Sequence, residues 1–391
     1  MPRYHTYKKA RNPSSLPMIV RYTYDRVLIR ALRIATPPPE LTMTEQTIKT
    51  RILIISDTHC APLKPKNSDS PPPFAAPLPA ADILIHCGDL THTGQAGQYN
   101  QALDMLKEIQ APVKLVIAGN HDLTLDKEFM LNRQDLDGRL GEGMTAEKAA
   151  AACQKARDLW TAPDGRAKEE GITFLDEGLH QITLPNGARL HLYASPYTPE
   201  FYDWGFPYDR DTDRFNPTDN TLTDAKKAVQ NPVPAYSTSD LPIDILLTHG
   251  PPYGQGDQTD RGDYAGCPHL LLALMRSRPL LHCYGHIHEG WGAQKIRWSE
   301  RVDEVVATPT TIEDWKNGVW QAGIANNGLE SVSVNEEKTL QRRAAFLDVS
   351  RDGGLLRRGR ETALVNAAIM DVKYRPVNAP WLVDIELPKA S

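Results

Sequence analysis

Five short polar motifs, spread over much of the chain, limit what it can fold into. In chain order they are Asp57-Thr58-His59, Gly88-Asp89, Gly119-Asn120-His121-Asp122, Thr248-His249-Gly250 and Gly285-His286-Ile287-His288. Several directly follow an apolar run of the kind that forms a buried strand, namely ILIIS, ADILIHC, VKLVIA and IDILL. In α/β sheets, ligands bind where such strands end. The pattern therefore predicts an α/β fold with one polar site assembled from distant segments.

The residue types in these motifs are those of metal ligands. Carboxylate, imidazole and carboxamide donors together suit borderline metals such as Mn, Fe or Zn. Asp57 and His59 are two residues apart just past a strand, so both side chains can leave on one side. Asp89 follows a glycine, which allows the backbone to approach a metal closely. A single histidine is more often a hydrogen-bonded core or surface residue, but the five motifs together favour a metal site.

Four histidines outside this context are interpreted as structural: His86, His92, His269 and His282. Of these, His92 is close enough to Asp89 along the chain to reach a substrate.

The order of the motifs, D-x-H, G-D, G-N-H-D, T-H-G and G-H-x-H, resembles that of the calcineurin-like metallophosphoesterases and spans Arg51 to Gly290. The flanking segments resemble more narrowly the metallophosphoesterase-domain-containing (MPPED) group, in a fungal-type form. These segments are ASPYTP at 194–199, DWGF at 203–206, ILLTHGPPYG ending at Gly254, AGC at 265–267 and GHIHEGWG ending at Gly292. The tail VNAAIMDVKYRPVNAPWLVDIELP resembles that group's C-terminal strand pair.

This resemblance implies a four-layer αββα sandwich of two mixed sheets with insertions. It also implies two divalent ions that share Asp89. One ion would take Asp57, His59, Asp89 and His288, and the other would take Asp89, Asn120, His249 and His286. His121 would contact the phosphate or protonate the leaving group, and Asp122 would orient it. Some members that resemble the MPPED group have glycine at the position of His286. The histidine is present in this chain, which predicts a complete dinuclear site.

Two ions about 3.5–4 Å apart can clamp a phosphate and generate a hydroxide nucleophile at neutral pH. The resemblance therefore implies hydrolysis of a small phosphate ester, and the leading expectation is a phosphodiester such as a cyclic nucleotide. The ions would be Mn, Fe or Zn, with Mn favoured in vitro. The alternatives are a phosphomonoesterase, a hydrolase of specialised metabolism with the same fold, and a low-activity scaffold or binding protein.

Candidate substrate contacts are His92, Tyr197, Trp204 and Arg261. Tyr197 and Trp204 belong to an aromatic cluster at 197–208, which is either a packed loop core or a wall that stacks an aryl group. Arg261 either pairs with a phosphate or is solvated at the surface.

The composition of the chain limits which classes of binding partner are expected. The chain has 391 residues and a formal net charge of -5, which predicts no general affinity for nucleic acid or anionic membranes. No apolar run approaches the roughly 20 residues of a membrane span.

The five cysteines have no paired spacing, and an odd count argues against a disulfide framework. A cytoplasmic protein is expected, or a mitochondrial one if the basic segment 1–42 is a transit peptide. No feature specifies an oligomeric state.

Residues 1–48 are predicted to form a basic, disordered extension, with Met43 as a natural start for the fold. Residues 49–391 are predicted to form a single domain with insertions near 61–81, 127–170 and 209–240. The first insertion is a proline-rich loop that should start near the mouth of the site. The second is mainly helical, with Thr145 as an N-cap, and the third is a polar surface loop.

Local signals predict several further elements. Asn186-Gly187 predicts a hairpin that leads into a strand at 189–194. Later strands are expected at 344–349, 364–374 and 381–387, and a helical piece near 311–317.

Overall fold

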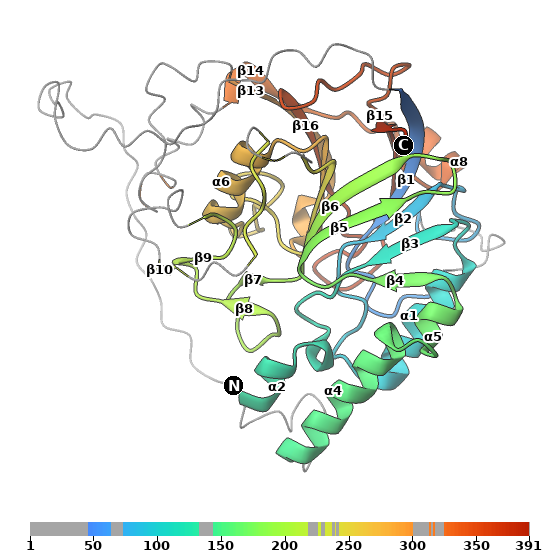
Figure 1. Ribbon diagram of the computed structural model, residues 1–391, viewed down its shortest axis with the longest axis vertical. Coiled ribbons are helices and arrows are strands. Elements are labelled where there is room, and N and C mark those ends of the chain that lie inside the picture. Colours follow the sequence, from blue (N-terminus) through green and yellow to red (C-terminus); the bar gives the residue numbers. More distant parts are fainter. Residues whose placement is uncertain are drawn as a thin grey trace, which may run out of the picture. The chain divides into compact units, whose positions relative to one another are not determined.

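The computed structural model describes residues 46–63, 73–132, 144–217, 226–227, 231–236, 239, 242–299, 313, 316 and 324–390. They belong to one compact unit, Ile34–Ser391. Two mixed sheets form the centre of this unit, and helices cover their outer faces (Figure 1).

The first sheet has the strand order β15-β17-β1-β2-β3-β4. Its strands are β1 (Thr47–Ile55), β2 (Ile83–His86), β3 (Val113–Val116), β4 (Ile172–Phe174), β15 (Ala345–Asp348) and β17 (Trp381–Pro388). Strands β1 to β4 are parallel, and β17 pairs antiparallel with β1.

The second sheet has the order β14-β13-β16-β12-β11-β6-β5. Its strands are β5 (Gly178–Thr183), β6 (Arg189–Ser195), β11 (Ile245–Thr248), β12 (Leu281–Tyr284), β13 (Gly292–Trp298), β14 (Ile324–Ser331) and β16 (Glu361–Asn366). Strands β6, β11, β12 and β16 are parallel, while β5 and β13 run antiparallel to their neighbours. Two short pairs lie outside the sheets: β7 (Thr198–Pro199) with β8 (Pro207–Tyr208), and β9 (Thr212–Asp213) with β10 (Lys226–Lys227).

Alternate side chains of a strand point to opposite faces of its sheet, and this explains how the sheets and helices form layers. In β1, Ile52 and Ile54 pack into a core that also holds residues of the second sheet, such as Leu192. Leu53 and Ile55 point to the opposite face, into a core shared with helix α1 (Ala96–Glu108). On the second sheet, helix α6 (Pro268–Ser277) packs into a third core. The layers are therefore helix, sheet, sheet and helix, which confirms the predicted fold class.

The remaining helices are α2 (Lys127–Asn132), α4 (Ala146–Thr161), α5 (Arg166–Glu169) and α8 (Glu336–Arg342), with 3-10 turns η1 (Leu123–Leu125) and η2 (His288–Gly290). Thr145 caps α4 by accepting a hydrogen bond from Lys148 N, as predicted. Trp160 of α4 is buried in the core beside α1, so this insertion contributes to the domain core. Every helix among the described residues is too short or too polar to cross a lipid bilayer.

Several sequence-based predictions need correction. The extension was predicted to end at residue 48, but β1 begins at Thr47, whose register partner is Pro388. Within the third insertion, Asp213, Phe215 and Asn216 are fully buried rather than part of a surface loop. Asp213 Oδ1 accepts hydrogen bonds from the backbone amides of Phe215 and Asn216, which turns Phe215 inward. The predicted helical piece at 311–317 lies largely outside the described residues.

The C-terminal tail also differs from its prediction. The strand expected at 364–374 ends at Asn366. The two tail strands, β16 and β17, do not pair with each other but belong to different sheets. The loop between them is too long for a tight hairpin, and it crosses from one sheet to the other. It carries Tyr374 into the region of the polar motifs.

Candidate metal centre

All five motifs lie at the carboxyl ends of parallel strands, and the sequence predicted this position for four of them. Asp57, Asp89 and Asn120 follow β1, β2 and β3 in the first sheet. His249 and His286 follow β11 and β12 in the second sheet. The motifs of the two sheets therefore meet in one place.

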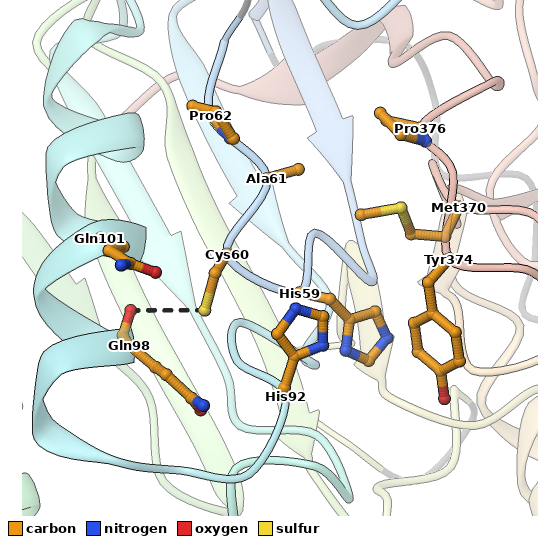
Figure 2. A pocket seen from close by; sticks show the side chains of 10 residues that line it. All are labelled: His59, Cys60, Ala61, Pro62, His92, Gln98, Gln101, Met370, Tyr374 and Pro376. Atoms are coloured by element: carbon orange, nitrogen blue, oxygen red, sulfur yellow. Dashed lines mark hydrogen bonds between the residues drawn. The ribbon is translucent and has the colours of Figure 1, made fainter.

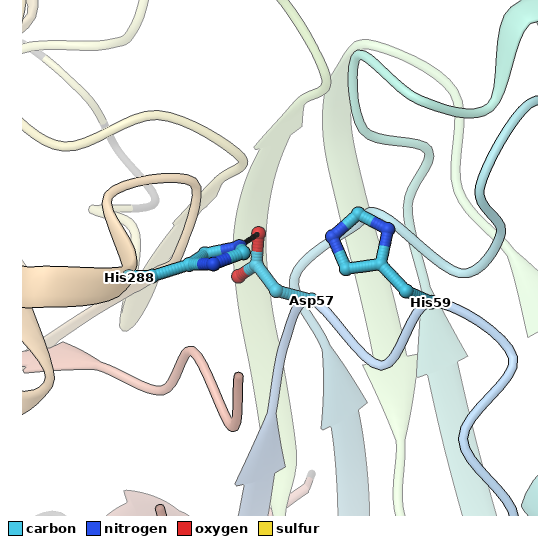
Figure 3. Close-up of side chains that lie close together, drawn as sticks. All are labelled: Asp57, His59 and His288. Atoms are coloured by element: carbon cyan, nitrogen blue, oxygen red, sulfur yellow. Dashed lines mark ion pairs between the residues drawn. The ribbon is translucent and has the colours of Figure 1, made fainter. Parts of the chain in front are cut away.

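Three overlapping groups of side chains there could hold metal ions. They are Asp57, His59 and His288; His59, Asp89 and His121; and Asp89, His249 and His286. Within each group the ligand atoms lie within 4.8 Å of one another. Figure 3 shows the first group, in which His288 and His59 approach Asp57 from different strand ends. Asp89 belongs to two of the groups: its Oδ2 lies 3.5 Å from His59 Nε2, and its Oδ1 lies 3.3 Å from His249 Nε2.

Backbone carbonyls fix the orientation of three of these imidazoles. His59 Nδ1 donates to Thr91 O at 2.9 Å, His249 Nδ1 to Cys87 O at 2.8 Å, and His288 Nδ1 to Asp371 O at 3.0 Å. Because a carbonyl only accepts, each Nδ1 carries a hydrogen, so each of these rings presents a lone pair at Nε2 when it is neutral. This arrangement is typical of metal-binding histidines.

Polar atoms of the cluster converge in one buried place. His59 Nε2 is buried and has no hydrogen-bond partner among the described residues. His249 Nε2 lies 2.8 Å from Asn120 Oδ1 and 3.3 Å from Asp89 Oδ1. A cation bound between these nitrogen and oxygen atoms would satisfy all of them. The donor set therefore fits a metal centre.

The electrostatics point the same way. Although burial opposes it, the Asp89 carboxylate raises the pKa of His249 to about 9. Burial also opposes ionisation of Asp57, yet the His288 imidazole lowers the pKa of Asp57 to about 2. Burial lowers the pKa values of His59 and His286 to about 3. The carboxylates thus stay charged and attract positive charge, while two of the histidines stay neutral and able to coordinate.

The backbone around the cluster is held in unusual conformations. Asp57, His59, Asp89 and His286 have positive φ angles of 54°, 41°, 56° and 67°. Non-glycine residues seldom adopt this left-handed region, and the surrounding structure must hold them there. His286 N donates to both Asp57 carboxylate oxygens, at 3.1 and 3.0 Å, which links the last motif to the first.

His121 lies at the edge of the cluster. Its Nδ1 donates to His92 O at 2.9 Å. Its ring stacks on Trp204 with centroids 3.7 Å apart and planes 24° apart. Its Nε2 lies 3.5 Å from the hydroxyl of Tyr374. The ring is thus held on one face and at one nitrogen, with the second nitrogen directed toward Tyr374.

Asp122 does not make the contact predicted for it. Its carboxylate accepts hydrogen bonds from the backbone amides of Leu90, Thr91 and Gly119 and from Thr91 Oγ1. It therefore ties the second motif to the third, and the His92 carbonyl orients His121 instead. Burial and then the nearby Asp89 raise the pKa of Asp122 to about 7. The sequence shows only that Asp122 adjoins His121; which polar atoms surround it depends on the tertiary structure.

The candidate substrate contacts separate into two pairs. His92 stacks on His59 with centroids 5.5 Å apart, and Trp204 stacks on His121. Tyr197 instead packs edge-on to Phe206 and under the Arg214 guanidinium, and it lines a different cavity. Arg261 is exposed, and the backbone amide of its neighbour Asp260 donates to Glu289, the residue after His288. His92 and Trp204 thus contact rings of the site, whereas Tyr197 packs elsewhere and Arg261 makes no contact with the site among the described residues.

Tyr374 is the site residue that the sequence did not reveal. Its ring lies 4.8 Å from that of His59 and 5.5 Å from that of His288, centroid to centroid. Its backbone φ is 57°, another left-handed value. The segment was interpreted as a strand, and nothing local marks its tyrosine as part of a site.

Comparisons with known proteins agree with this geometry. A family model described as calcineurin-like phosphoesterase matches residues 50–290. Human metallophosphoesterase domain-containing protein 1 is 31% identical over 344 residues, covering 88% of this chain and 73% of the human protein, and the mouse protein gives the same values. A probable rhamnogalacturonate lyase C of Emericella nidulans is 30% identical over 250 residues, which is 63% of this chain and 18% of that protein.

The family match covers all five motifs and well over half of the chain. The side chains that it spans form the buried histidine and aspartate groups described above. The chain therefore belongs to the calcineurin-like phosphoesterase family and is a metal-dependent phosphoesterase.

Proposed function

We propose that this chain is a phosphodiesterase for small esters such as cyclic nucleotides, and that it uses two divalent metal ions. The observation that carries the proposal is the position of Asp89. One of its carboxylate oxygens faces His59 and the other faces His249. A carboxylate that presents one oxygen to each of two ligand groups is suited to bridge two ions.

In this proposal, one ion would be held by Asp57, His59, Asp89 and His288, and the other by Asp89, Asn120, His249 and His286. When bound, two such ions polarise a phosphoryl oxygen and lower the pKa of water. We expect Mn²⁺ to support the highest rate in vitro.

His121 is the side chain assigned to proton transfer or phosphate contact. Since its Nδ1 hydrogen is committed to the His92 carbonyl, only Nε2 can face a substrate. When the ring carries a second proton, Nε2 can donate it to the departing oxygen. Trp204 stacks on the ring and keeps this nitrogen in place, and Tyr374 lies within reach of the same atom. Asp122 acts indirectly, by joining the loops that carry Asp89 and His121.

The charge of the proposed site suits a phosphate ester. The proposed ligand set holds only two carboxylates, Asp57 and Asp89, against two divalent ions, so the loaded site would keep a positive charge. The lining of the cavity beside His59 contains no lysine, arginine, aspartate or glutamate, so it offers no ionic partner to a further charged group of the ester. A diester, which carries one negative charge and two organic groups, suits a positive centre next to an uncharged cavity.

A metal and substrate panel tests the proposal. The protein is purified, its metal content is measured by elemental analysis, and the metals are removed with a chelator. Activity is then measured, with and without added Mn²⁺, on bis(p-nitrophenyl) phosphate, 2′,3′- and 3′,5′-cyclic nucleotides, and p-nitrophenyl phosphate. We expect two ions per chain, loss of activity on chelation, recovery with Mn²⁺, and higher kcat/KM for diesters.

Two results would contradict it. Much higher kcat/KM for the monoester than for every diester would reject the diesterase assignment and leave the metal centre standing. A protein that binds no metal and cleaves none of these esters would support a scaffold instead.

A further inference from the structure

A cavity of about 490 Å³ opens beside His59 (Figure 2). It is lined by His59, Cys60, Ala61, Pro62, His92, Gln98, Gln101, Met370, Tyr374 and Pro376. Its volume lies within the range of small-molecule sites. Because His59 belongs both to the cavity wall and to the candidate ligand groups, the cavity adjoins the metal centre.

Three segments that are distant in sequence form its wall. The loop after β1 contributes Ala61 and Pro62, so the proline-rich segment does start at the mouth of the site, as predicted. In Figure 2, Gln101 lies on helix α1 on one side of the opening, and Tyr374 and Pro376 lie on the other. His59 and His92 lie between these two sides.

The wall contains no lysine, arginine, aspartate or glutamate. Much of it is apolar, formed by alanine, proline and methionine side chains. Transfer of a second charged group into such a cavity, without a partner of opposite sign, would be unfavourable. The cavity therefore suits an uncharged group.

Two glutamines provide the polar part of the wall, and they differ in availability. Gln98 Oε1 accepts from Thr93 N at 2.9 Å, and its Nε2 donates to Thr93 Oγ1 at 3.1 Å, so its carboxamide is already engaged. Gln101 is exposed, and its carboxamide makes no hydrogen bond within the described part of the chain. Gln101 can therefore both donate to and accept from a bound group.

The aromatic rings at the metal end suit a planar group. Tyr374 lies 6.1 Å from His92 and 4.8 Å from His59, centroid to centroid. The rings of His59 and His92 are themselves stacked. Tyr374 meets both rings edge-on or tilted and remains 45% exposed, so part of its ring is free to pack against a planar group.

We infer that this cavity binds the uncharged organic group of the ester, a planar group with a hydrogen-bonding edge such as a nucleobase, against Tyr374 and with Gln101 at its edge. This inference rests on the proposed function, because it assumes that the phosphate lies at the metal centre. It assigns the organic group to the side of His59 and the tail loop. Tyr197 and Trp204, the aromatic residues expected from the sequence, do not line this cavity.

The test compares two cyclic diesters with the same five-membered phosphate ring. One is adenosine 2′,3′-cyclic phosphate, and the other is ethylene phosphate, which lacks the nucleoside. Two variants probe the cavity in different ways: Gln101→Ala removes the free carboxamide, and Ala61→Phe fills space. Gln341→Ala is the matched control, because Gln341 is an exposed helical glutamine outside the cavity wall.

We expect Gln101→Ala to raise KM for the adenosine substrate by about 3- to 10-fold, as for one lost hydrogen bond. Ala61→Phe should lower kcat/KM for it by a larger factor. Both variants should leave ethylene phosphate hydrolysis, metal content and Tm unchanged, and Gln341→Ala should change nothing. Equal effects on the two substrates, or no effect on either, would overturn the inference.

A binding measurement separates this inference from the proposed function. The affinity of adenosine 5′-monophosphate for the Mn²⁺-loaded protein is measured by calorimetry in the same variants. If neither cyclic diester is cleaved, the proposed function fails, and the binding data still decide the role of the cavity. Weaker binding in Gln101→Ala and Ala61→Phe supports it, and unchanged or undetectable binding in all proteins rejects it.

Discussion

The two sheets contribute different chemistry to the candidate metal centre. The strand ends of the first sheet provide every oxygen donor, from Asp57, Asp89 and Asn120, together with His59. The strand ends of the second sheet provide only imidazoles, two of which are His249 and His286. Negative charge thus comes from one sheet, and most of the nitrogen donors come from the other. Neither sheet alone would offer a set of ligands for two cations.

The contact between the two sets depends on residues without side chains. A Cβ on Gly285 would lie 2.1 Å from Asp57 Oδ2, and one on Gly119 would lie 2.7 Å from His249 Cε1. Both distances are far shorter than van der Waals contact, so a side chain would force the motifs apart. A bridge between Ser56 and Ala368 ties β1 to the tail loop at the same place. The comparison teaches that the fold must bring the sheets together closely before either set of ligands is useful.

The largest effect is expected from the shared carboxylate of the first sheet. Asp89→Asn removes the charge that faces both ligand groups, so both ions should be lost and hydrolysis abolished. Asp57→Asn should mainly disturb one ion, because Asp57 belongs to one group. Elemental analysis of the two variants checks this difference. Unchanged metal content in Asp89→Asn would show that the carboxylate does not bridge.

The contact between the sheets can be broken without changing any ligand. Gly285→Ala places a methyl group against Asp57 and Ser56, so metal content and kcat/KM should both fall, by about 10²-fold or more for the latter, since small misplacements carry such costs. The control is Gly97→Ala in α1, where a Cβ meets nothing within 4 Å. This control should keep full activity and gain about 0.5–1 kcal/mol in unfolding free energy. Wild-type metal content in Gly285→Ala would show that the sheets tolerate a wider separation.

A substitution of His121, which follows a strand of the first sheet and is not a proposed ligand, should separate metal binding from catalysis. His121→Ala should keep both ions and lose turnover by roughly 10²–10⁴-fold, as for a lost general acid. Metal content and kcat are measured on the same preparation. If the ions are lost together with the activity, His121 is a ligand, consistent with its place in the group with His59 and Asp89.

Substitutions in the aromatic cluster at 197–208 should have smaller effects on turnover, and the effects of its two tested residues should differ. Trp204→Ala removes the ring that stacks on His121, so kcat should fall by about 2- to 10-fold while metal content is unchanged. Tyr197→Ala should change neither kcat nor KM, because Tyr197 packs against Arg214 and Phe206. Steady-state kinetics decide between this result and the expectation from sequence, in which both residues contact the substrate. A raised KM in Tyr197→Ala would restore that expectation.

The smallest effect is expected from the N-terminal segment. A chain that begins at Met43 keeps Thr47 and the rest of β1, and therefore all pairing with β17. Its Tm and its kcat/KM should equal those of the full chain. Calorimetry and a diester assay test this, and a fall of many degrees in Tm would show that the first residues pack onto the domain.

Local sequence patterns predicted much of the fold correctly. Apolar runs followed by polar residues marked β1, β2, β3 and β11, since a buried strand and its end are local properties. The cap of α4 and the hairpin between β5 and β6 were also local signals, and both are confirmed. The apolar side chain of Phe215 was hidden in a polar segment, so its burial was missed.

In the site, too, some features follow from local sequence and others from tertiary contacts. By itself the sequence determined which candidate metal ligands are present, their order, and for most of them their placement at strand ends, because each depends on a few neighbouring residues. Only the tertiary structure decided that the His92 carbonyl holds His121, that Asp122 binds backbone amides, and that Tyr374 enters from the tail. These contacts join segments far apart in the chain, and hydrogen bonds and ring packing act over a few ångströms of space. Their partners are therefore set by how the two sheets face each other, which no local pattern encodes.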